Sequence, residues 1–137
     1  IVKLVREMTG EVKDGGTIIL GNGDVKDVVD GKEKAKTCGA DGVMIGRGIF
    51  GTPWLFDTSD THAKTIEERL RILVEHTKLY EEKLGDIKSF AIMKKHYKAY
   101  VNGFDGAKEL RVELMECANS QEIEEKVGQW LQNNRTL

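Results

Sequence analysis

The fold is decided by two short segments, TIILGNGD at residues 17–24 and GVMIGRG at residues 42–48. Each segment begins with a continuous run that is rich in β-branched and apolar residues, and each run is followed by glycines that flank a polar side chain. Short continuous runs of this kind are typical of strands that are buried on both faces of a parallel sheet. We therefore predict strands at residues 17–20 and 42–45, each followed by a tight turn.

A short helix is predicted between the two strands, within residues 26–37. Asp27 or Asp30 can cap its N-terminus, and Gly39 lies just past its end. Such a βαβ unit pairs its strands in parallel through a right-handed crossover. Two parallel strands cannot cover their own edges, and the chain begins with Ile1 rather than Met. We therefore expect either dimerisation or, as the favoured alternative, further strands that precede this segment in a longer parent protein.

The chain changes character after a polar stretch at residues 57–60. Glycines are concentrated before it, whereas the residues after it are charged and show the apolar period of amphipathic helices. We therefore divide the chain into an α/β domain at residues 1–57 and a small all-α helical bundle at residues 62–137. In the first domain, two more helices are predicted, Ile1–Met8, which ends at Gly10, and Ile49–Leu55. In the second domain, one predicted helix begins with a capping box at Thr65 and Glu68 and runs to Leu84, and the next is Ile87–Val101. Two more follow, one capped by Asp105 and one capped by Asn119 or Ser120.

Composition excludes several classes of protein. The 137 residues are 39% hydrophobic and 32% charged, so the chain can bury a modest core, and the net charge of −2 excludes a uniformly basic nucleic-acid-binding protein. No apolar run approaches the roughly 20 residues of a membrane span, and no signal peptide is visible. Cys38 and Cys117 are isolated, which is typical of buried, reduced thiols in a cytoplasmic protein. His62, His76 and His96 share no ligand spacing, so no metal site is predicted.

The two turns carry the candidate chemistry. The first contains Asn22, Gly23 and Asp24, and the second contains Gly46 and Arg47. Glycines let the backbone approach a ligand and turn its N–H groups toward an anion, and a guanidinium adds a charged, forked donor. The carboxyl ends of parallel strands share one edge of a sheet, where the last two loops of a β/α barrel recurrently form a phosphate site. The pair of turns therefore predicts the binding of a phosphate-bearing ligand.

Structural roles stay open for the same residues. Asn22 and Gly23 also suit a tight turn with positive φ, and Asp24 can cap the helix that follows. Arg47 can instead form a structural ion pair with Asp24 or Asp41. In these interpretations the turns shape the fold and bind no ligand.

A set of motifs that covers nearly all of residues 17–118 resembles one known family. The motifs are NGD at 22–24, TCGADGVMIGRG at 37–48, GTPWLF at 51–56, MKKHY at 93–97, GFDGA at 103–107 and LR at 110–111. Together they resemble the tRNA-dihydrouridine synthases. The resemblance implies that residues 1–57 are the last two βα units of a TIM (β/α)8 barrel with an FMN phosphate site. It also implies that residues 62–137 are the C-terminal tRNA-binding helical domain.

The activity implied by the resemblance is the FMN-dependent reduction of uridine in tRNA to 5,6-dihydrouridine, with NADPH as the electron donor. By position, the residues that would hold the FMN phosphate are Asn22, Gly23, Asp24, Gly46 and Arg47. The family's catalytic cysteine lies upstream of this segment. Cys38 is therefore expected to be a buried packing residue, and the segment alone is expected to be inactive. The full-length form is expected to be monomeric.

Contact with tRNA is expected on the helical domain. The residues expected to bind RNA are Lys94, Lys95, His96 and Arg111, with Lys88 and Lys98 adding to the same basic charge. Solvated lysines are also ordinary on helices, and Tyr97 and Tyr100 are expected in the core rather than as stacking platforms. Two alternatives stay open: another FMN-dependent β/α-barrel oxidoreductase acting on a small molecule, and a non-catalytic helical interaction module.

Overall fold

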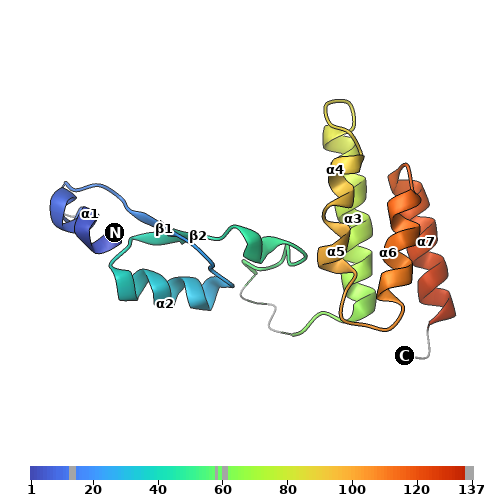
Figure 1. Cartoon of the computed structure of the whole chain (residues 1–137), viewed down its shortest axis with the longest axis horizontal. Helices are drawn as coiled ribbons and strands as arrows, with labels where there is room; N and C mark the ends of the chain where they lie inside the picture. Colours follow the sequence, from blue (N-terminus) through green and yellow to red (C-terminus); the bar gives the residue numbers. More distant parts are fainter. Residues whose placement is uncertain (13–14, 58, 60–61, 135–137) are drawn as a thin grey trace. The chain divides into compact units, whose positions relative to one another are not determined.

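The computed structural model describes residues 1–12, 15–57, 59 and 62–134. The chain divides into two compact units, Ile1–Asp60 and Thr61–Leu137. Among the described residues, the first unit contains a small sheet with helices, and the second contains helices alone (Figure 1).

The first unit is built on a two-stranded parallel sheet, as the sequence predicts. Strand β1 (Leu20–Asn22) pairs with strand β2 (Gly42–Met44), and Gly21 lies opposite Val43. Helix α2 (Val28–Cys38) connects the two strands and lies along the sheet (Figure 1). The predicted βαβ unit is therefore confirmed.

The ends and the packing of α2 follow from single residues. Asp27 is the N-cap, and its carboxylate accepts a hydrogen bond of 2.8 Å from the N–H of Asp30. Gly39 ends the helix in the left-handed conformation, with φ 75°. Gly31 is buried, and a Cβ atom at this position would stand 2.8 Å from a methyl group of Val43. The missing side chain therefore lets α2 lie close to β2.

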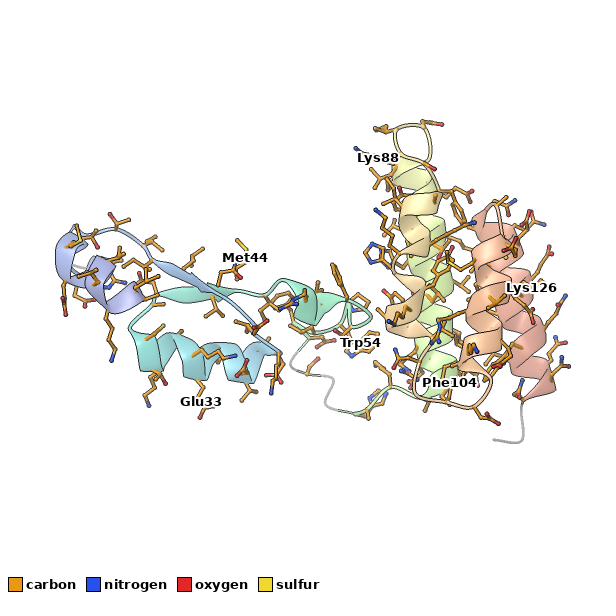
Figure 2. All side chains as sticks on the ribbon, in the orientation of Figure 1. Glu33, Met44, Trp54, Lys88, Phe104 and Lys126 are labelled. Atoms are coloured by element: carbon orange, nitrogen blue, oxygen red, sulfur yellow. The ribbon has the colours of Figure 1, made fainter. Side chains whose placement is uncertain are left out.

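The first strand differs from its prediction in extent and in burial. It begins at Leu20 rather than at Thr17, so Gly21 and Asn22 belong to the strand and not to the turn. The side chains of Leu20 and Met44 are 60% and 55% exposed, so the strands are not buried on both faces in this chain. Met44 projects from the face of the sheet opposite α2 (Figure 2). That face therefore presents apolar side chains to solvent.

The helix predicted over Ile49–Leu55 is wrong. A single 3-10 turn, η2 (Arg47–Ile49), is followed by irregular turns. Gly51 takes φ 79°, and Pro53 has no N–H to donate to a helical hydrogen bond. These two residues interrupt helical geometry within one turn of the start.

Helix α1 (Val2–Thr9) ends at Gly10 as predicted and is tied to the sheet through one arginine. The guanidinium of Arg6 pairs with the carboxylate of Asp41, which also accepts a hydrogen bond of 2.7 Å from the N–H of Ile19. The Ile19 N–H and the Arg6 guanidinium both lower the pKa of Asp41. The carboxylate thus joins α1, the approach to β1 and the approach to β2.

The second unit is a small bundle of antiparallel and connecting helices. Its elements are α3 (Ile66–Leu84), α4 (Ala91–Lys94), α5 (Tyr97–Tyr100), α6 (Ala107–Glu116) and α7 (Ser120–Asn133). Helix α3 packs against α7 and α5, and α6 packs against α7 and α5. The largest fully buried side chains are Tyr97, Tyr100, Leu70, Leu73, Met93, Leu110, Leu114 and Ile123. Apolar stripes from each helix therefore meet in one core.

Of the three helix caps predicted in this unit, two are confirmed and one is wrong. Thr65 and Glu68 form a complete capping box, in which the carboxylate of Glu68 accepts a bond of 2.8 Å from the N–H of Thr65. That bond is the main cause that lowers the pKa of Glu68 to about 2. Asn119 caps α7 with its side-chain oxygen. The residue before α6 is Gly106, with φ 77°, rather than Asp105.

The helix predicted over Ile87–Val101 is divided into α4 and α5. Between them the N–H of His96 bonds to the carbonyl of Met93 at 3.0 Å, three residues back rather than four. Such bonds tighten the backbone locally. Met93, Tyr97 and Val101 are nevertheless all buried, so the division keeps the apolar side chains on one face.

Replacing Leu73 by alanine is expected to lower the free energy of unfolding of the bundle by about 2–5 kcal/mol. Leu73 is fully buried, so its truncation leaves a cavity. Leu79→Ala is the matched control, because Leu79 lies on the same helix and is 54% exposed; its cost is expected to stay near about 0.5 kcal/mol. Urea unfolding followed by helical circular dichroism measures both. Equal losses for the two variants would contradict the bundle packing.

Candidate functional site

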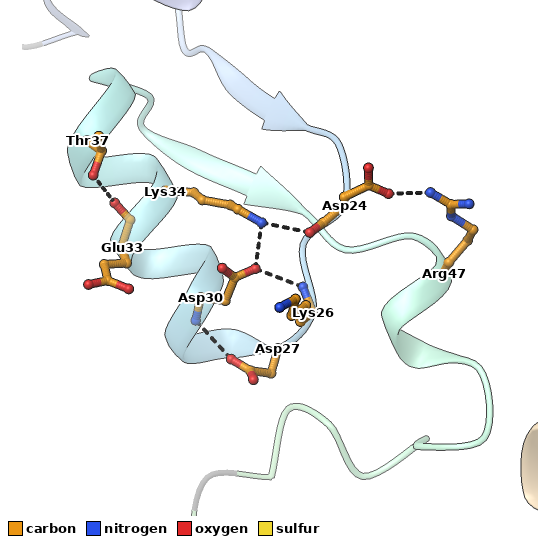
Figure 3. Close-up of polar contacts among 8 residues, drawn as sticks. All are labelled: Asp24, Lys26, Asp27, Asp30, Glu33, Lys34, Thr37 and Arg47. Atoms are coloured by element: carbon orange, nitrogen blue, oxygen red, sulfur yellow. Dashed lines mark hydrogen bonds and ion pairs between the residues drawn. The ribbon is translucent and has the colours of Figure 1, made fainter.

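The two turns lie directly against each other beyond the carboxyl ends of the strands (Figure 3). A Cβ atom on Gly48 would stand 2.7 Å from the carbonyl oxygen of Lys26 and 2.8 Å from that of Val25. These distances are far inside van der Waals contact, so only a residue without a side chain allows the approach. The backbone of the second turn is therefore in contact with the backbone that follows the first.

An ion pair joins the two turns at their surface. The guanidinium of Arg47 bonds to the carboxylate of Asp24, and the side chains are 83% and 81% exposed. The alternative pairing of Arg47 with Asp41 is wrong, because Asp41 pairs with Arg6. Exposed ion pairs contribute little to stability, since water and salt screen them. Arg47 can therefore exchange its carboxylate partner for another anion at small cost.

A hollow of about 620 Å³ lies between the turns. Its lining residues are Asn22, Gly23, Asp24, Val25, Lys26, Gly46, Arg47 and Gly48. All five residues that the sequence assigns to phosphate binding contribute to this one hollow. Lys26 is an additional cation that the sequence analysis missed, although it follows the NGD motif by only two positions.

The hollow offers several donors and one opposing charge. Arg47 provides a forked cation, and the N–H groups of Arg47 and Gly48 begin a 3-10 turn and so have no acceptor within it. Gly23 takes φ 137°, as a glycine in a tight turn can. Asp24 does not cap α2, because Asp27 does. The carboxylate of Asp24 would repel an anion. Asp24 can therefore contribute to such a site only by orienting Arg47 and through its own backbone groups.

A second candidate surface lies on the helical unit. A groove of about 510 Å³ is lined by Lys94, Tyr97, Lys98, Lys108, Arg111, Val112, Met115 and Glu116. Of the four residues predicted to bind RNA, the groove contains Lys94 and Arg111. Lys95 is exposed outside it, and the ring of His96 lies 5.5 Å from that of His76. Lys108 was missed, although its spacing of three residues from Arg111 places both on one face of α6.

The groove residues also tie helices together. The ammonium of Lys94 donates a hydrogen bond of 2.5 Å to the carbonyl of Met115, and Arg111 donates one of 2.7 Å to the carbonyl of Val101. Each side chain has further N–H donors, so these bonds leave capacity for a ligand. Tyr97 is 1% exposed and is a core residue, as predicted.

Tyr100 is likewise buried in the core, as predicted, and its hydroxyl lies 2.9 Å from Nδ1 of His76. Burial raises the pKa of Tyr100 to about 12. Burial, and then His96, lower the pKa of His76. His76 and Tyr100 are therefore both neutral when their hydrogen bond connects α3 to α5. Neither residue lines the groove of α5 and α6.

The two cysteines differ from each other. Cys117 is 4% exposed, as predicted for a core residue, and burial raises the pKa of its thiol. Cys38 is only half-buried, which corrects the prediction of a buried packing residue. It is the last residue of α2, at the helix end away from the Asp27 cap, and its thiol lies 3.7 Å from the carbonyl of Ala35.

Two other features are absent from the described residues. There, no group of three or more histidine, cysteine, aspartate or glutamate side chains is arranged to hold a metal ion. The same part of the chain has no helix long and apolar enough to cross a membrane.

The family model for dihydrouridine synthase (Dus) matches residues 3–135, which is almost the whole chain. The chain belongs to the dihydrouridine synthase family. The match runs through both units, so the turns of the first unit and the basic groove of the second both fall within the family's sequence pattern.

Curated members with similar sequences carry the name "Probable tRNA-dihydrouridine synthase". The protein from Staphylococcus aureus (strain MRSA252) is 36% identical over 126 residues, which are 91% of this chain and 37% of that protein. The one from Staphylococcus epidermidis (strain ATCC 12228 / FDA PCI 1200) is 35% identical with the same coverage. The one from Rickettsia conorii (strain ATCC VR-613 / Malish 7) is 30% identical over 82% of this chain and 36% of its own length. The chain thus spans little more than a third of these relatives.

Gly48→Ala is expected to force the two turns apart, because the new methyl group would meet the carbonyls of Val25 and Lys26. The amide signals of those two residues in ¹H–¹⁵N spectra of the chain should shift or broaden. Gly21→Ala is the control, since a Cβ atom at Gly21 has no neighbour nearer than 3.7 Å. Unchanged signals of Val25 and Lys26 in the Gly48 variant would show that the turns are not in contact.

Proposed function

We propose that this chain is the C-terminal part of a flavin-dependent tRNA-dihydrouridine synthase. Residues 1–57 form the last two βα units of its TIM (β/α)8 barrel, and residues 62–137 form its tRNA-binding domain. The family membership and the names of the relatives support the proposal, as does the 37% of their length that the chain spans. In this proposal the enzyme reduces uridine in tRNA to 5,6-dihydrouridine, and NADPH supplies the electrons.

The open face of the sheet supports the barrel. Met44 lies on the face opposite α2 (Figure 2), and the strand register places Leu20 on the same face; the two residues are 55% and 60% exposed. A two-stranded sheet with an uncovered apolar face has little stability of its own. Neighbouring barrel strands would pair with its edges, and the side chains of the barrel interior would cover this face.

The observation that carries the flavin assignment is the convergence of both turns on one hollow that contains Arg47. FMN ends in a phosphate group, and a forked guanidinium with nearby N–H donors suits a phosphate. Lys26 adds a second positive charge. Bound FMN supplies the hydride that a uracil ring accepts, and the residues of this chain hold its phosphate and so fix the position of the flavin.

Arg47→Ala is expected to lower the bound flavin of the enzyme. The test protein is a chimera in which the segment of the Staphylococcus aureus relative that precedes the matched region is joined to this chain. Losing charge-assisted hydrogen bonds worth about 1.5–3 kcal/mol weakens FMN binding by about 10- to 100-fold. The flavin absorbance per protein after purification measures this effect.

Arg71→Ala is the matched control for the flavin experiment. Arg71 is exposed on α3 and pairs with Glu67, so its loss removes the same side chain without touching the hollow. It should leave the flavin content unchanged. A normal flavin content in the Arg47 variant would contradict the assignment of the hollow to FMN.

The groove of α5 and α6 supports contact with tRNA. Four cationic side chains, Lys94, Lys98, Lys108 and Arg111, line it beside a single acid, Glu116. Phosphate contacts by lysine and arginine release counterions and so make binding sensitive to salt. Exposed apolar surface at Val112 and Met115 adds area that bases or sugars can cover.

Lys98→Gln is expected to weaken tRNA binding severalfold and to lower the slope of log affinity against log salt by about 1. Lys95→Gln tests the placement, because Lys95 is a neighbouring exposed lysine outside the groove. Lys83→Gln, on α3, is a control for the loss of charge alone. Filter binding at several salt concentrations measures all three. A larger effect of Lys95 than of Lys98 would contradict the groove as the RNA surface.

A further inference from the structure

Two side chains of α2 form hydrogen bonds with the backbone of the first turn. The ammonium of Lys34 donates a hydrogen bond of 2.7 Å to the backbone carbonyl of Asp24 and one of 2.8 Å to the carboxylate of Asp30. The same carboxylate oxygen of Asp30 accepts a bond of 2.9 Å from the N–H of Lys26. Figure 3 shows this chain of contacts from the helix to the turn. Asp30 and Lys34 thus hold both ends of the segment from Asp24 to Lys26.

The fastened residue has an unusual backbone. Asp24 takes φ 46°, and no other non-glycine residue in the described part of the chain has a positive φ. Residues with a side chain rarely adopt this conformation, although aspartate tolerates it better than most, and surrounding contacts help to hold it. Its carbonyl is held by Lys34 and its carboxylate by Arg47. The hydrogen bond from Lys34 therefore stabilises the one residue of the turn that has a side chain and a positive φ.

The pair is charged and partly shielded from water. The side chains of Asp30 and Lys34 are 25% and 43% exposed. The Lys34 ammonium, and then the Lys26 N–H, lower the pKa of Asp30, so the carboxylate is ionised at neutral pH. Neither residue lines the hollow between the turns. Their effect on a ligand there is therefore indirect, through the backbone of the turn.

We propose that Asp30 and Lys34 are positioning residues, which keep the turn from Gly23 to Lys26 in the form that receives a phosphate. The inference rests on the proposed function of the hollow as a phosphate site. A peptide carbonyl and the next N–H point in opposite directions. Because Lys34 directs the carbonyl of Asp24 toward α2, the N–H of Val25 is directed away from the helix. Without the ammonium, the carbonyl of Asp24 loses its partner on α2, and the direction of the Val25 N–H is held less firmly.

The experiment compares FMN with riboflavin, which lacks the phosphate, on the chimera with the Staphylococcus aureus segment. All residues that line the hollow belong to this chain, so a preference for FMN reports phosphate recognition by these residues. Quenching of flavin fluorescence measures both affinities, and the unsubstituted chimera should bind FMN more tightly than riboflavin. Lys34→Met should weaken FMN binding on the order of tenfold, as losing an outer support of a binding group does, and leave riboflavin binding unchanged. Lys34→Arg, which keeps a cationic donor, should restore part of the loss.

Two further variants separate the possible failures. Lys32→Met removes an exposed lysine of the same helix and should keep the FMN affinity of the unsubstituted chimera. Arg47→Ala should abolish the preference for FMN over riboflavin. If Arg47→Ala abolishes the preference but Lys34→Met keeps full FMN affinity, the positioning role is overturned and the phosphate site stands. If the unsubstituted chimera itself shows no preference for FMN, the phosphate site and the positioning role are both overturned.

Discussion

The contact of Gly48 with the backbone after the first turn is the constraint on which the candidate site depends. Parallel pairing of β1 and β2 brings the two strand ends to one edge, but it does not bring the turns into contact. The contact requires a residue without a side chain, since a Cβ atom there would overlap two carbonyl oxygens. Gly31 has the same role under the sheet, where it lets α2 approach β2. Close packing beyond the strand ends and between α2 and the sheet thus positions the residues that line the hollow.

Charged side chains then hold the backbone of the first turn. The segment from Asp24 to Lys26 is held by Arg47 from the second turn and by Asp30 and Lys34 from α2. The ion pair of Arg47 with Asp24 is exposed, so Arg47 can leave Asp24 and bind an incoming anion. The ion pair of Asp30 with Lys34 on α2 is partly shielded from water and stays in place. A fixed backbone beside a guanidinium that can change partners is the arrangement that a phosphate site needs. In the proposed site, Asp24 therefore supports the arrangement and is not one of the groups that bind the phosphate.

Much of the fold follows from sequence patterns, and the misses have physical causes. The βαβ unit and the Thr65 capping box depend on neighbours in sequence, so they were predicted, and the cap of α2 is Asp27, one of the two candidates Asp27 and Asp30. The exposure of Leu20 was not predicted, because it depends on whether other segments cover the sheet. The helix predicted over Ile49–Leu55 does not form, because Gly51 and Pro53 interrupt helical geometry. The bond from Lys34 to a carbonyl ten residues earlier follows from the packing of α2, which no spacing rule reveals.

A crystal structure of the chimera grown with FMN tests the central claim most directly. The account predicts phosphate oxygens within about 2.7–3.2 Å of the Arg47 guanidinium and of at least one N–H group from each turn. It also predicts that the guanidinium, which bonds to the Asp24 carboxylate through one nitrogen in this structure, donates to the phosphate when FMN is bound. A flavin whose phosphate lies away from both turns, with Arg47 still paired to Asp24, would contradict the account.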